Sequence, residues 1–84
     1  MTVSRQDIVE RIARVLAGQH YSVNGDGGER SASDQVEATW PHYVDDAVAI
    51  LKTMREPDET MAAAGDVAVW ESMIHAAIPQ GELA

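Results

Sequence analysis

The 84-residue chain contains no cysteine and no phenylalanine, and it has 6 lysines and arginines against 14 aspartates and glutamates. The absence of cysteine excludes disulfides and thiolate metal sites. The net charge of -8 disfavours direct binding to DNA, RNA or anionic lipid, because like charges repel. No apolar run approaches the roughly 20 residues that cross a bilayer, and no basic segment followed by an apolar stretch opens the chain. We therefore predict a soluble, cytoplasmic protein with a basic partner and no membrane association.

The negative charge is unevenly distributed. Residues 1–30 carry equal numbers of acidic and basic residues, whereas residues 31–84 carry 10 acids and 2 bases. The chain is 45% hydrophobic and 24% charged, which is typical of a globular protein. At this length we expect one domain over residues 1–84, with a small core.

The first predicted helix covers residues 5–17. Ser4 is its expected N-cap, with Asp7 three residues later in the position of a capping box. Gly18 is the residue type that commonly follows a helix end. The glycine-rich stretch beyond it breaks the helical periodicity, so we predict a flexible loop over about 18–33.

The second helical pattern is an apolar stripe that extends from Val36 to Met54. A helix capped by Ser33 would contain Pro41, which removes a hydrogen bond and kinks the helix. A helix capped by Thr39 would instead place Pro41 in its first turn, where proline is tolerated. We favour the second arrangement, with a short turn at 34–38 and a helix from about 40 to 54.

Two further helices are expected after Pro57, which ends the preceding helix near residue 55. The apolar pattern changes phase at Gly65, so a break is predicted there, and Asp66 is the expected cap of a last helix that ends near residue 78. Residues 80–84 are expected to fray. The predicted fold is all-α, a compact bundle of three to four short helices with a Gly-rich loop after the first.

Three short motifs resemble a pattern in small acidic helical proteins of uncharacterised function that phages and prophages encode. The pattern reads W-x-x-Y-x-x-x-A, then R-E-P, then W-x-x-M-I-x-A-A, and it starts in this chain at Trp40, Arg55 and Trp70. Most of these positions are core and capping residues, so the resemblance implies shared packing and brings no catalytic residues. Short phage proteins often inhibit host machinery, including CRISPR effectors and polymerases, so the resemblance also favours an inhibitory role.

The sequence offers no convincing catalytic, metal or cofactor site. His42 and Asp46 are four residues apart on one predicted helix, but two ligands do not make a metal site. The segment that begins at Asn24 resembles a calcium loop but has Glu29 where the loop requires glycine. Phosphate-binding, nucleophile and metalloprotease motifs do not occur. We therefore predict a non-enzymatic protein without cofactor or metal.

Trp40 and Trp70 each belong to an apolar stripe. Tryptophan is enriched among the hot spots of protein interfaces, so either residue could anchor a partner. In a chain without phenylalanine we favour the alternative, that both are large core residues.

The candidate binding residues are acidic side chains expected to lie outside the apolar stripes: Glu37, Asp45, Asp46, Glu56, Asp58, Glu59 and Asp66. Carboxylates on a rigid scaffold can imitate nucleic-acid phosphates and bind a partner protein through its basic, nucleic-acid-binding surface. The predicted function is then that of a phage-type inhibitor, such as an anti-CRISPR protein.

Alternatively, the acidic residues provide solubility alone. A further alternative is a small structural or regulatory homo-oligomer formed through an exposed apolar stripe, so that monomer and homodimer both remain open.

Overall fold

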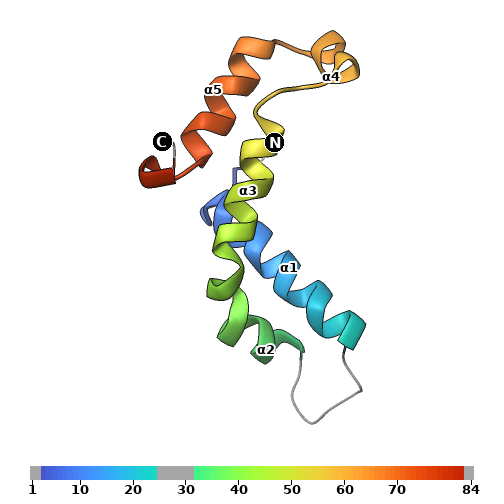
Figure 1. Cartoon of the computed structure of the whole chain (residues 1–84), viewed down its shortest axis with the longest axis vertical. Coiled ribbons are helices and arrows are strands. Elements are labelled where there is room, and N and C mark those ends of the chain that lie inside the picture. The colour runs from blue at the N-terminus through green and yellow to red at the C-terminus, as the bar shows by residue number, and fades with distance from the viewer. Residues whose placement is uncertain (1–2, 25–31, 83–84) are drawn as a thin grey trace. The chain divides into compact units, whose positions relative to one another are not determined.

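The computed structural model describes residues 3–24 and 32–82, and in these ranges the regular secondary structure is entirely helical (Figure 1). The predicted all-α fold class is therefore confirmed. The elements are α1 (Ile8–Asn24), α2 (Ala32–Thr39), the 3₁₀-helix η1 (Trp40–Tyr43), α3 (Val44–Met54), α4 (Glu59–Ala64), α5 (Val67–Ala77) and the 3₁₀-helix η2 (Gln80–Glu82). The chain divides into two compact units, Met1–Ala47 and Val48–Ala84, which we call unit 1 and unit 2. The single domain over residues 1–84 stays a prediction.

Helix α1 starts later and ends later than its sequence pattern predicts. Its N-cap is Asp7 rather than Ser4, because Asp7 Oδ1 accepts a hydrogen bond from the Glu10 backbone N–H at 2.8 Å. The Ser4 hydroxyl instead accepts from the backbone N–H of Gln6 at 3.2 Å. The helix then continues through Gly18 to Asn24. Asp7, which is nearer to the apolar stripe than Ser4, therefore caps the helix.

Gly18 does not end α1, because it faces α2. A Cβ atom added to Gly18 would lie 3.7 Å from Val36 Cγ2, an ordinary contact distance, so Gly18 lies where α1 meets α2. Contacts with α2 offset the propensity cost of about 1 kcal/mol for a glycine within a helix. The predicted loop over 18–33 is wrong for residues 18–24 and 32–33, which are helical, and its residues 25–31 lie outside the described residues.

The remainder of unit 1 consists of α2, η1 and the first turn of α3, and both α2 and η1 pack against α1. The segment 34–38 lies in helix α2 and is not the short turn that we predicted. Thr39 makes no side-chain cap, since its hydroxyl donates to the Gln35 carbonyl oxygen at 2.7 Å. Pro41 lies in the first turn of η1, where proline is tolerated, as the favoured arrangement predicts.

Unit 2 follows the predicted helix boundaries closely. Asp58 Oδ1 accepts from the Met61 N–H at 2.9 Å and caps α4, and Asp66 Oδ1 accepts from the Val69 N–H at 3.1 Å and caps α5. The predicted break at Gly65 is confirmed. Residues 80–82 form η2, residues 83–84 lie outside the description, and fraying of the tail stays a prediction.

The buried side chains are small in number, as expected for a short chain. Those of unit 1 are Val9, Ala13, Ala17 and Ala47, and those of unit 2 are Val48, Leu51, Ile74 and Ile78. Trp40 and Trp70 are half-buried, so neither belongs to the fully buried core in which large core residues were expected. Each tryptophan also contacts a polar or charged group within its own unit.

Candidate protein-binding surfaces

Three of the seven predicted binding residues lie in unit 1. Asp45 and Asp46 are in the first turn of α3, and both are exposed. A carboxylate there interacts favourably with the positive end of the helix dipole. Neither side chain has a hydrogen bond or ion pair with any described residue. Both charges are therefore open to solvent and available to a partner.

Glu37, the third acidic residue of unit 1, is already paired. Its Oε2 accepts from Arg14 Nη1 at 2.8 Å, and Arg14 Nε also donates to Glu10 Oε2 at 2.8 Å. The hydrogen bonds with Glu37 and then with Glu10 raise the pKa of Arg14 above its usual value. Because Arg14 brings a positive charge beside Glu37, that carboxylate contributes less to an acidic surface than Asp45 or Asp46.

Arg14 also explains the environment of Trp40. The guanidinium carbon lies 5.2 Å from the centroid of the Trp40 ring, a distance typical of a cation–π contact. The indole is thus covered on one face by a charged group that the sequence pattern did not connect with it. Arg14 joins α1, α2 and η1 through these contacts and serves the structure of unit 1.

The other four predicted residues, Glu56, Asp58, Glu59 and Asp66, lie in unit 2 and are all exposed. Asp58 and Asp66 hold the N-termini of α4 and α5, so they have a structural role whether or not they bind a partner. Glu56 and Glu59 make no hydrogen bond or ion pair with the part of the chain that the structure describes. Of these four predicted residues, Glu56 and Glu59 are therefore the two whose charge has no structural role in the described residues.

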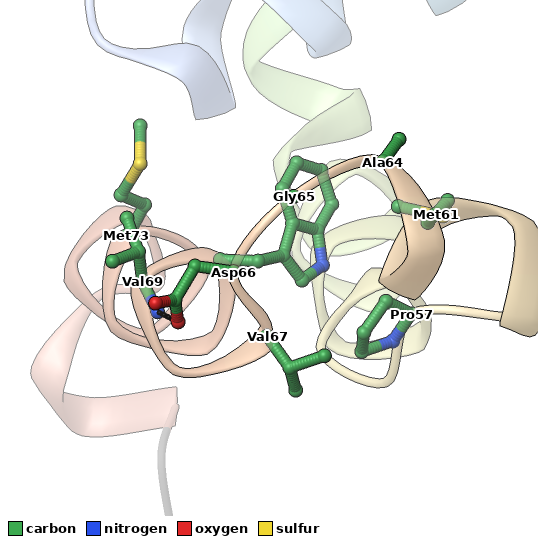
Figure 2. A pocket seen from close by; sticks show the side chains of 9 residues that line it. Pro57, Met61, Ala64, Gly65, Asp66, Val67, Val69 and Met73 are labelled. Atoms are coloured by element: carbon green, nitrogen blue, oxygen red, sulfur yellow. Dashed lines mark hydrogen bonds between the residues drawn. The ribbon is translucent and has the colours of Figure 1, made fainter.

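Unit 2 also contains an apolar groove, which the sequence pattern did not predict. The groove has a volume of about 360 Å³. Residues of α4, of α5 and of the segments that precede each helix line it. Figure 2 shows Pro57, Met61 and Ala64 toward one side of the view and Val69 and Met73 toward the other. Asp66 is the one charged residue among the nine that line it: Pro57, Met61, Ala64, Gly65, Asp66, Val67, Val69, Trp70 and Met73. We call this feature the α4–α5 groove.

The lining side chains are unusually exposed for apolar residues. The exposed fractions are 64% for Met73, 55% for Val69 and 40% for Met61. One feature of the sequence could have predicted this exposure. The apolar pattern changes phase at Gly65, so the apolar residues of α4 and α5 lie on different helical faces. That change indicates that the two short helices do not share one buried face.

Trp70 fixes one part of the groove through a hydrogen bond. Its Nε1–H donates to the Met54 carbonyl oxygen at 2.7 Å, which links the start of α5 to the end of α3 within unit 2. The indole therefore contacts the groove with its apolar surface while its polar atom is satisfied.

Among the described residues, no three histidine, aspartate or glutamate side chains come together in a group that could hold a metal ion. The helices in the described ranges include none with the length and apolar character needed to cross a membrane.

Comparisons of the chain with protein-family models, curated proteins and solved structures find no match. The resemblance to phage and prophage proteins accordingly stays a prediction.

Proposed function

We propose that the chain is a non-catalytic protein that binds a basic partner protein through exposed carboxylates. The observation that carries the proposal is the position of Asp45, Asp46, Glu56 and Glu59, which are exposed and make no ion pair with any described residue. An ion pair within the chain would have to be broken before such a carboxylate could bind a lysine or arginine of the partner. These four carboxylates carry no such cost.

The proposed partner has a basic surface of the kind that binds nucleic acid. The net charge of -8 attracts such a surface over a distance of about one Debye length, about 10 Å at 0.1 M salt. Occupation of that surface would exclude the nucleic acid, and the chain would act as a phage-type inhibitor of the anti-CRISPR kind. A cytoplasmic location belongs to the same proposal.

The experiment begins with affinity capture from a bacterial lysate and identification of the captured protein by mass spectrometry. The purified partner is then titrated with Asp45→Lys, Asp46→Lys, Glu56→Lys and Glu59→Lys variants. Glu71→Lys is the matched control, because Glu71 is an exposed acid outside the predicted set and its reversal changes the net charge equally.

Weaker binding by the four variants than by Glu71→Lys supports the proposal, as does competition by DNA or RNA for the partner. Equal affinities for all five variants contradict it, since the net charge alone would then account for binding.

A homo-oligomer is the second candidate function, and the exposed side chains of Met61, Val69 and Met73 favour it. Apolar side chains exposed together often mark a protein interface. Light scattering at micromolar concentration separates the two candidates, because the first requires no self-association and the second requires a dimer or larger assembly.

A further inference from the structure

Helix α4 has too little buried surface to be stabilised by the packing of unit 2. It has six residues, none of them buried. Helices shorter than about 12 residues are marginal in water unless tertiary contacts cover one face. The Asp58 cap satisfies one backbone N–H but buries no apolar area. A partner that covered Met61 and Ala64 would supply the missing contact.

The charge around the α4–α5 groove is mostly negative, and Arg55, just before Glu56, is the nearest basic residue in the sequence. From Glu56 to the end of the chain the sequence contains six acidic residues and neither lysine nor arginine. A second copy of the chain would bring the same negative charge to this face, so repulsion opposes self-association there. A basic segment is attracted instead.

The groove also restricts the form that the segment can take. Strand addition requires an open sheet edge, and the described residues contain no strand. Proline-rich segments dock between several aromatic side chains, whereas Trp70 is the one aromatic residue that lines this groove. An amphipathic helix needs an apolar groove for side chains spaced three and four residues apart. Methionine side chains, such as Met61 and Met73, adapt readily to such a surface.

We propose that the α4–α5 groove binds the apolar face of a basic amphipathic helix in the partner protein. Met61 and Met73 contact the apolar side chains of that helix. The lysines or arginines that flank those apolar side chains are attracted by Glu56, Glu59 and Asp66. This inference rests on the proposed function, because it specifies which part of a basic partner is recognised and which surface of the chain recognises it.

The probe is a synthetic peptide of leucine and lysine, about 14 residues long, with its leucines on one helical face. The scrambled control has the same composition and charge, with its leucines spread around the helix. Binding to the full chain is followed by NMR of ¹³C-labelled methionine methyl groups. We expect the Met61 and Met73 signals to shift, and the scrambled peptide to bind about tenfold more weakly.

Matched variants locate the contact. Met61→Ser and Met73→Ser each weaken binding of the patterned peptide about tenfold, as expected for loss of one apolar anchor. Val15→Ser is the control, because Val15 is an exposed apolar residue of unit 1, with an exposed fraction of 58%, and does not line the groove. Far-UV circular dichroism checks that each variant retains the helix content of the parent chain.

The outcomes separate this inference from the proposed function. If Glu56→Lys and Glu59→Lys weaken binding while Met61→Ser and Met73→Ser do not, the groove proposal is overturned and charge-based binding stands. If the methionine variants weaken binding and the charge reversals do not, the groove binds an apolar helix and the basic character of the partner is overturned. Equal binding of the two peptides overturns the groove proposal, as does a dimer of the chain that Met73→Ser converts to a monomer.

Discussion

The Trp70 indole N–H donates a 2.7 Å hydrogen bond to the carbonyl oxygen of Met54. The last four carbonyl groups of an α-helix have no partner within the helix, and Met54 is the final residue of α3. The indole therefore satisfies a backbone acceptor that would otherwise depend on water. The same bond holds the half-buried Trp70 at the α4–α5 groove, so this side chain contributes both to the packing of unit 2 and to the groove wall.

The first prediction is that Trp70→Phe destabilises the chain by about 1 kcal/mol, because phenylalanine retains an aromatic ring but cannot donate this hydrogen bond. Urea unfolding followed by circular dichroism measures the change. Trp40→Phe is the matched control, since Trp40 contacts Arg14 through its ring face, which phenylalanine preserves. A Trp70→Phe variant as stable as the parent chain would show that the bond contributes nothing.

The second prediction concerns the caps of α4 and α5. Asp58→Ala and Asp66→Ala each remove a side-chain acceptor of the helix N-terminus and should cost about 1 kcal/mol of stability. Asp66→Asn keeps an acceptor and should cost less, although it removes the charge. If the alanine and asparagine variants are equally unstable in urea, the charge rather than the cap is responsible.

The third prediction distinguishes the observed α1 from the helix ending at residue 17. Gly18→Ala should stabilise the chain by about 0.5–1 kcal/mol, because alanine is the better helix former and its Cβ would make an ordinary contact with Val36 at 3.7 Å. If Gly18 instead ended the helix in a left-handed conformation, the same substitution would destabilise it. Thermal unfolding shows directly whether the substitution stabilises or destabilises the chain.

The fourth prediction is that Arg14→Lys lowers the thermal unfolding midpoint while Arg11→Lys does not. Arg14 donates to Glu10 and Glu37 through separate nitrogens and lies over the Trp40 ring, which the single ammonium group of lysine cannot reproduce. Arg11 is exposed, so its replacement by lysine provides a charge-matched control. Equal midpoints for the two variants would exclude a structural role for Arg14.

Local sequence signals predicted unit 2 better than unit 1. An aspartate before an apolar helical pattern predicts the cap at Asp66, and the change of phase in that pattern predicts the break at Gly65. Both predictions are confirmed. The end of α1 does not follow from local signals, because the packing of Gly18 against Val36 outweighs the preference of glycine for helix ends. The environment of Trp40 likewise depends on Arg14, which lies 26 positions earlier in the chain.

The candidate surfaces were predictable only in part. Exposure of the acidic residues follows from their position outside the apolar stripes, but the pairing of Glu37 with Arg14 is a contact between helices that spacing does not specify. The α4–α5 groove depends on how two short helices meet at Gly65. The apolar pattern identifies Met61 and Met73 as helix residues and cannot tell that both stay exposed.

The most direct test of the account is the affinity between the chain and its captured partner as a function of ionic strength. Exposed carboxylates that bind a basic surface are screened by salt, so the affinity should fall steeply between about 50 and 300 mM. The fall should be shallower for the Glu56→Lys and Glu59→Lys variants. An affinity that stays constant across this range would contradict the central claim that the chain works through the charge on its surface.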